Sequence, residues 1–141
     1  MTNLNENKKR NIFICQYTDD IQSVQTQSNE LTYFNQSNRL QTFMNLIHIY
    51  HQKGPLMVYC LNGLGCTGLF LCIYYYLTLF KTDFFSNSTN TNFIFDTVKL
   101  LRTQRFGVIQ TKEQYKYCYT FFLQLFSQKL NAFNNQVLQS A

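Results

Sequence analysis

One segment of this chain, residues 55–68, restricts the fold more than any other part. An apolar run, Leu56–Tyr59, leads into Cys60, a glycine-bearing loop follows, and a strongly apolar stretch, Leu69–Phe80, comes next. A short apolar run between a proline and a loop is typical of a buried central strand. The apolar stretch is too short to span a bilayer, and it predicts a buried core helix from about Thr67 to Phe80.

This order of elements places Cys60 between the end of a strand and the start of a helix. Loop amides and a helix N-terminus together bind anions, and a thiol among them shifts toward the thiolate, its nucleophilic form. The candidate phosphate loop after Cys60 contains Leu61, Asn62, Gly63, Leu64, Gly65, Thr67 and Gly68. This loop has no Arg, Lys or His, so it resembles a catalytic loop without its cationic side chain.

The remaining segments predict three more helices and an edge strand. The strand is expected over Asn11–Tyr17, and one helix is expected from about Ser37 to Lys53. The others are expected over Phe93–Thr103 and from Thr111 to about Leu130, where Thr111-Lys112-Glu113-Gln114 matches a capping box. The apolar stripe expected on the last helix contains Tyr115, Tyr119, Phe122 and Phe126.

Together these segments predict an α/β fold with few central strands flanked by about four helices. Residues 1–10 are polar and predict a disordered N-terminal tail. The domain is expected over residues 11–132, and residues 133–141 are expected to form a C-terminal tail.

Composition restricts the partners and the location of the protein. The net charge is +5, but the 12 Lys and Arg are scattered, whereas nucleic-acid binding requires a dense basic stripe. We therefore expect no nucleic-acid partner. The start of the chain lacks the apolar core of a secretory signal, so neither secretion nor membrane insertion is expected. Five cysteines in such a chain predict reduced thiols and a cytoplasmic protein.

The spacing of the cysteines indicates whether they could form a metal site. Cys60, Cys66 and Cys72 are separated by five-residue gaps, which is not zinc-ribbon spacing. We therefore expect no metal and no cofactor. A disulfide or redox role for Cys60 and Cys66 stays open, because the loop could bring the two thiols close together.

Two separated segments resemble the C-terminal half of the protein tyrosine phosphatase family. The family's cysteine loop reads His-Cys, five residues, then Arg-(Ser/Thr)-Gly, and the same frame here reads Tyr59-Cys60, five residues, Cys66-Thr67-Gly68. The family's second signature, Leu-Arg-x-x-Arg-x-x-x-(Val/Ile)-Gln-Thr-x-x-Gln-Tyr, is similar to residues 101–115. The resemblance covers about residues 37–130 and implies a truncated tyrosine-phosphatase-like domain.

The resemblance implies a known chemistry for these positions. The cysteine attacks phosphorus and forms a phosphocysteine, the loop Arg clamps two phosphate oxygens, and an Asp on a Trp-Pro-Asp loop protonates the leaving phenol. Glutamines of the second signature position water, and their counterparts here are Gln110 and Gln114. Both glutamines also fit a structural role in the turn and cap, and Arg102 and Arg105 fit a structural role at a helix end.

Three parts of that chemistry are missing from this chain. Cys66 stands at the position of the loop Arg, and Tyr59 replaces the His before the nucleophile. There is no Trp, the one proline is Pro55, and Asp19 and Asp20 lack the residues that would aim an acid loop. Losing a cationic clamp in phosphoryl transfer lowers the rate on the order of a thousandfold or more. Turnover is therefore not expected.

Three functions are consistent with this pattern. The first is a catalytically inactive pseudophosphatase that acts by binding, as a decoy or scaffold. The abundance of Asn, Phe and Tyr in this degenerate copy resembles the tyrosine-phosphatase-like proteins of bracoviruses. That resemblance implies the host cytosol and interference with a host phosphotyrosine-signalling protein.

The second function is a residual phosphatase that depends on Cys60 alone, and the third is a non-functional truncated remnant. A half-domain that lacks N-terminal strands would expose a sheet edge and apolar surface. Such a surface predicts a partner, self-association or poor solubility.

Overall fold

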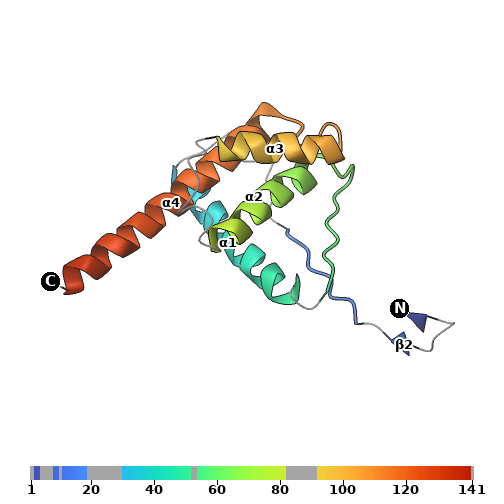
Figure 1. Ribbon diagram of the computed structural model, residues 1–141, viewed down its shortest axis with the longest axis horizontal. Coiled ribbons are helices and arrows are strands. Elements are labelled where there is room, and N and C mark those ends of the chain that lie inside the picture. Colours follow the sequence, from blue (N-terminus) through green and yellow to red (C-terminus); the bar gives the residue numbers. More distant parts are fainter. Residues whose placement is uncertain are drawn as a thin grey trace.

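The computed structural model describes residues 2–3, 8–9, 11–18, 30–51, 54–81 and 92–140. Four helices make up most of this part of the chain (Figure 1): α1 (Glu30–His51), α2 (Gly65–Lys81), α3 (Phe93–Gln104) and α4 (Lys112–Ser140). The strands β1 (Thr2–Asn3) and β2 (Lys8–Lys9) form a two-residue antiparallel pair with Thr2 opposite Lys9.

Helix α2 lies at the centre of the fold because it is apolar on almost every side. Its side chains Leu69, Cys72 and Ile73 are at most 1% exposed. Helices α3 and α4 pack directly on α2, and α1 packs on α4; Figure 1 shows α2 between α3 above and α1 below. Aromatic contacts join the layers, with centroid distances of 6.2 Å for Phe43–Phe70, 5.1 Å for Tyr76–Phe93 and 3.7 Å for Tyr76–Phe122.

The four predicted helices are confirmed, but two of them are longer than predicted. Helix α1 begins earlier than expected, at Glu30, and α4 continues to Ser140 through the segment expected to be a C-terminal tail. Among the described residues, no helix combines the length and the apolar character needed to cross a bilayer.

The predicted α/β architecture with central strands is wrong. Within the described part of the chain, β1 and β2 are the only strands, and residues 55–60 are extended without pairing to another strand. Leu56 and Val58 pack against the core, whereas Met57 and Tyr59 are 85% and 76% exposed. An all-apolar run predicts burial on both faces, but the helices cover only one face of this segment.

The expected edge strand over Asn11–Tyr17 is also wrong, because these residues form coil. Their contact with α1 is made by rings rather than by backbone pairing. The ring of Phe13 lies 4.6 Å from that of Tyr50, and the ring of Tyr17 lies 5.2 Å from that of Phe43.

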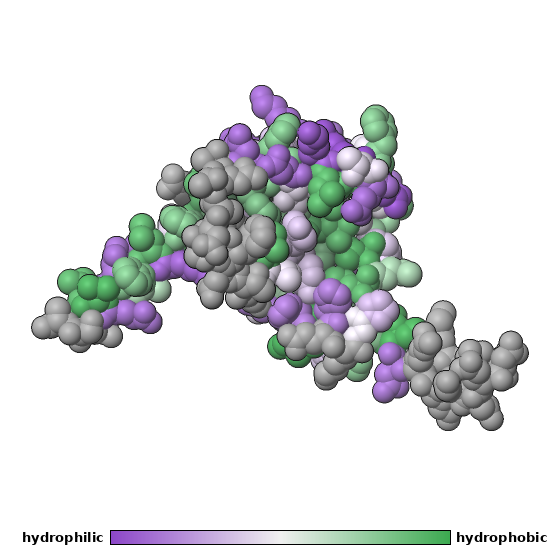
Figure 2. All heavy atoms as spheres, viewed as in Figure 1, coloured by the Kyte–Doolittle hydropathy of each residue, from purple (hydrophilic) through white to green (hydrophobic). Residues whose placement is uncertain are grey.

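The buried side of α4 differs from the predicted stripe. Tyr119 and Phe126 are 37% and 59% exposed. The apolar side chains of α4 that are buried are Tyr117, Cys118, Phe121, Phe122 and Leu125. The C-terminal part of α4 projects away from the other helices (Figure 1), and Figure 2 shows apolar side chains on this projecting part. Helix α4 therefore carries two apolar stripes, of which one packs into the core.

The first turn of α2 lies in direct contact with the segment after α3. A Cβ added at Gly68 would lie 2.6 Å from Val108 Cγ1 and 2.9 Å from the backbone nitrogen of Ile109. Val108 and Ile109 are both buried. A glycine at this position therefore permits an approach that any side chain would block.

We expect Gly68→Ala to lower the free energy of unfolding for this reason. Overpacking costs roughly 1–3 kcal/mol, and the better helix propensity of Ala offsets at most about 1 kcal/mol. The net loss expected in urea denaturation is about 1–2 kcal/mol.

Gly54→Ala is the matched control, because nothing lies within 4 Å of a Cβ added there. It should change the free energy of unfolding by less than about 0.5 kcal/mol. Equal stabilities of the two variants would contradict the close approach at Gly68.

Candidate functional site

The loop after Cys60 is closed by the side chain of Asn62. The Oδ1 atom of Asn62 accepts hydrogen bonds from the backbone N–H of Leu64 at 3.0 Å and from the thiol of Cys60 at 3.7 Å. Gly63 has a φ of 70°, a left-handed conformation that glycine adopts without a steric penalty. These features turn the chain from the extended segment into the first turn of α2.

Cys60 lies among hydrogen-bond donors from this loop. Burial raises the pKa of the Cys60 thiol. Hydrogen bonds from the hydroxyl and N–H of Thr67 and from the N–H groups of Gly63 and Asn62 lower it, and together they outweigh burial. The pKa of Cys60 is therefore below its ordinary value. The hydroxyl of Thr67 is buried and makes no hydrogen bond of standard geometry to any group that the structure describes, the Cys60 sulfur included. It is therefore available to donate to the sulfur when the thiol ionises. The thiolate is therefore favoured by amides and a hydroxyl rather than by a basic side chain.

The second signature segment packs against the same loop. The N–H of Ile109 donates to the carbonyl of Leu64 at 3.2 Å, and Nδ2 of Asn62 donates to Oε1 of Gln110 at 2.9 Å. The Nη2 atom of Arg105 donates to the carbonyl of Asn62 at 3.3 Å. The two sequence motifs thus form one site at the N-terminus of α2.

Arg102 holds the turn that makes these contacts. Its Nε and Nη2 atoms donate to the carbonyls of Val108 and Ile109 at 3.0 and 2.9 Å. Ile109 has a φ of 57°, which is unfavourable for a β-branched residue and costs on the order of 1–3 kcal/mol. The structural role expected for Arg102 is confirmed, and it acts through hydrogen bonds to this turn.

Gln114 caps α4 and borders the phosphate loop. Its Oε1 atom accepts from the N–H groups of Gln110 and Thr111 at 2.9 and 3.3 Å, and its own N–H donates to Oγ1 of Thr111 at 3.2 Å. The predicted capping box is therefore confirmed. Nε2 of Gln114 and Oε1 of Gln110 lie 2.7 and 3.1 Å from a Cβ built on Gly65. The capping role of Gln114 is confirmed, and a water-positioning role for either glutamine stays a prediction.

Cys66 is half-buried in the first turn of α2 and forms no disulfide bond with Cys60. The guanidinium of Arg105 reaches the loop but bonds a carbonyl there. Asp19 and Asp20 lie outside the described residues. Among the residues that the structure does describe, no three His, Cys, Asp or Glu side chains are grouped closely enough to hold a metal ion.

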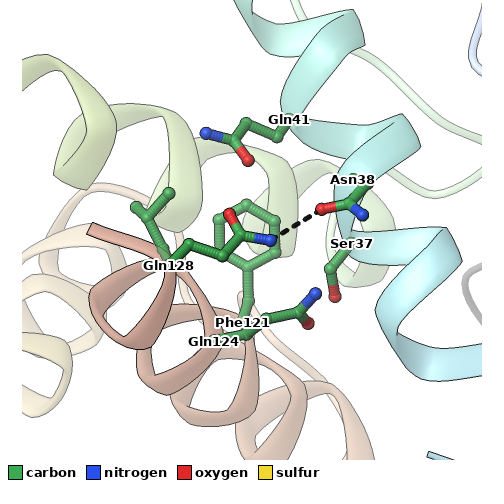
Figure 3. A pocket seen from close by; sticks show the side chains of 7 residues that line it. Ser37, Asn38, Gln41, Phe121, Gln124 and Gln128 are labelled. Atoms are coloured by element: carbon green, nitrogen blue, oxygen red, sulfur yellow. Dashed lines mark hydrogen bonds between the residues drawn. The ribbon is translucent and has the colours of Figure 1, made fainter. Parts of the chain in front are cut away.

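A polar hollow between α1 and α4 is a separate feature (Figure 3). Its lining consists of Ser37, Asn38, Gln41, Phe121, Gln124, Leu125 and Gln128. Gln128 donates to Oδ1 of Asn38 at 2.9 Å across it, and it has no room for a water molecule. Because no phosphate-loop residue lines this hollow, it is not part of the candidate site.

The chain belongs to the protein-tyrosine phosphatase family, whose profile matches residues 2–124. It is 37% identical over 92 residues to tyrosine-protein phosphatase non-receptor type 20 of Rattus norvegicus. The aligned region covers 65% of this chain and 20% of the relative. It is 34% identical over 88 residues to the non-receptor type 13 enzyme of Homo sapiens, covering 62% of this chain and 3% of the relative. The chain thus spans a fifth or less of the length of these relatives. No solved structure matches it significantly.

Sequence reasoning missed two parts of the site. The sequence places Asn62 in the loop without a specific role, and it places Arg105 at the end of a helix. Neither prediction includes the hydrogen bond between Arg105 and the carbonyl of Asn62. An Asn whose side chain accepts a bond from the amide two residues on forms an Asx-turn, so the local role of Asn62 had a detectable signal. The bond from Arg105 spans 43 positions and has no local signal.

Thr67→Val should raise the pKa of Cys60, because it removes a hydroxyl donor to the sulfur and keeps a similar shape. The measurement is the rate of alkylation of Cys60 by iodoacetamide as a function of pH, followed by peptide mass spectrometry. We expect the midpoint to move to higher pH and the rate at neutral pH to fall several-fold.

Thr78→Val is the matched control for this experiment. Its hydroxyl donates to the carbonyl of Tyr74 within α2 at 2.8 Å, away from the loop. The control should leave the midpoint for Cys60 unchanged. If Thr67→Val also leaves the midpoint in place, the hydroxyl does not stabilise the thiolate.

Proposed function

We propose that this chain is a catalytically inactive, phosphatase-like protein that acts by binding. The observation that carries the proposal is Cys66 in the first turn of α2, at the position of the family's loop Arg. A thiol is at most a weak donor and has no positive charge to offer. Phosphoryl transfer without its cationic clamp loses on the order of a thousandfold or more in rate.

The proposed ligand is a phosphorylated tyrosine side chain, bound weakly by the loop amides and the N-terminus of α2. The donors that lower the pKa of Cys60 support this, because they are arranged around a site for negative charge. Leu61 is fully exposed in the loop, and Phe106 is 93% exposed next to Arg105, which contacts the loop. These apolar groups suit the aromatic part of such a ligand.

Binding without turnover fits a decoy or scaffold in the phosphotyrosine signalling of a host cell, and we propose the cytoplasm as its location. The abundance of Asn, Phe and Tyr is the reason for proposing a bracovirus-type source. Because the chain spans a fifth or less of its relatives, the activity of those whole enzymes is not transferred to it.

A second candidate function is residual hydrolysis that depends on Cys60. It is favoured by the lowered pKa of the Cys60 thiol, which keeps the nucleophile in its reactive form. The charge of the transition state would still lack a cationic partner inside the loop. A turnover assay therefore separates the two functions.

We expect wild-type protein to hydrolyse para-nitrophenyl phosphate no faster than Cys60→Ser. This substrate is chosen because nitrophenolate leaves without a general acid, so the assay tests only the loop. Cys66→Arg should show turnover or a nitrophenol burst, since it places a guanidinium in a preserved cradle.

The double variant Cys60→Ser with Cys66→Arg is the control for the gained activity and should be inactive. Wild-type turnover that disappears in Cys60→Ser would contradict inactivity and support the second function. A silent Cys66→Arg variant would show that more than the clamp has been lost.

Binding is tested separately by titrating the protein with a phosphotyrosine peptide in a calorimeter. We expect wild-type affinity near the millimolar range, about −4 kcal/mol, and at least tenfold tighter binding by Cys66→Arg. Cys15→Arg adds the same charge at an exposed cysteine outside the loop and should leave the affinity unchanged. Absence of wild-type binding at millimolar peptide would overturn the decoy proposal.

A further inference from the structure

The exposed side of α4 carries a regular row of apolar residues, which we call the seam. The seam consists of Leu123, Phe126, Leu130, Phe133 and Val137. Their spacing alternates between three and four residues, which is the heptad pattern of a coiled coil. Each of the five side chains is between 50% and 68% exposed.

The seam is distinct from the stripe by which α4 packs into the core. That stripe ends at Leu125, whereas the seam continues to Val137. At 3.6 residues per turn, the two rows lie roughly a third of a turn apart on the helix. The packing of α4 on α2 therefore leaves the seam exposed.

From these observations we infer that the seam binds a second copy of this chain and forms a two-stranded coiled coil. The helix itself requires such packing, because helical stability comes mainly from a packed apolar face. The projecting part of α4 includes Asn131, Asn134 and Asn135, and asparagine is a poor helix former. Its helical state is thus best explained by a contact along the seam.

The exposed area of the seam fits an interface of this kind. Aromatic side chains contribute roughly 150–250 Å² each when buried, and leucine and valine contribute somewhat less. At exposed fractions of 50–68%, the two phenylalanines and three aliphatic residues present on the order of 500 Å² per copy. Two copies together would bury on the order of 1,000 Å², which is about the lower limit for a specific interface. A contact that covers both seams completely therefore lies at the lower end of the size range for a specific interface.

The charges near the seam favour an identical partner over a charged one. Between residues 117 and 140, the only charged residue is Lys129. An acidic or basic partner would find almost no complementary charge here. In a dimer each copy contributes one lysine near the seam, so the repulsion between like charges is small.

Sedimentation equilibrium of the full chain over a wide concentration range tests this inference. We expect a reversible monomer–dimer equilibrium, with α-helical circular dichroism increasing as the dimer forms. Leu130→Glu and Phe133→Glu should each weaken the dimer at least about tenfold, because a carboxylate would be buried in the interface. Both side chains are exposed outside the core, so at concentrations where the wild type is monomeric the variants should keep its thermal unfolding.

Asn135→Glu is the matched control, since it adds the same charge to an exposed position on another side of α4. It should keep the dimer affinity of the wild type. A wild-type chain that stays monomeric at every concentration would overturn the inference. The seam would then be covered by another part of the same chain or by a different protein. A dimer that survives both Leu130→Glu and Phe133→Glu would overturn it as well.

Discussion

The need to bury α2 organises the whole molecule. This helix is apolar on almost every side, and each fully buried Leu or Ile contributes roughly 1.5–3 kcal/mol, so α3 and α4 pack directly against it. The same packing fixes the N-terminus of α2, where the loop after Cys60 begins the helix. The core therefore determines both the shape of the fold and the position of the donors around Cys60.

The candidate site keeps much of the residue pattern of the family's cysteine loop, and its retained residues have structural roles of their own. Gly68 permits the contact with Ile109, Arg102 holds the turn after α3, and Gln114 caps α4. Selection for a stable fold would preserve each of them without any catalytic need. Cys66 stands at the position where the family's loop carries an Arg, so this chain has no positive charge there.

Helix existence followed from periodicity and caps, and the four helices occur close to where they were predicted. The prediction of central strands was wrong, because a strand requires a pairing partner that no local pattern reveals. The stripe predicted on α4 was also wrong in part, since Tyr119 and Phe126 are exposed. Two apolar stripes on one helix are equivalent in the sequence, and packing chooses between them.

Local patterns in the chain were enough to indicate the family, Cys60 at the family's nucleophile position, the absence of the loop Arg and the capping box, because each depends on residue types at short, fixed spacings. Three-dimensional packing settled which side of α4 is buried and joined Arg105 and Gln110 to Asn62 across more than forty positions. Contacts between residues so far apart in the sequence form because the burial of α2 brings their segments together. No short stretch of sequence therefore predicts them.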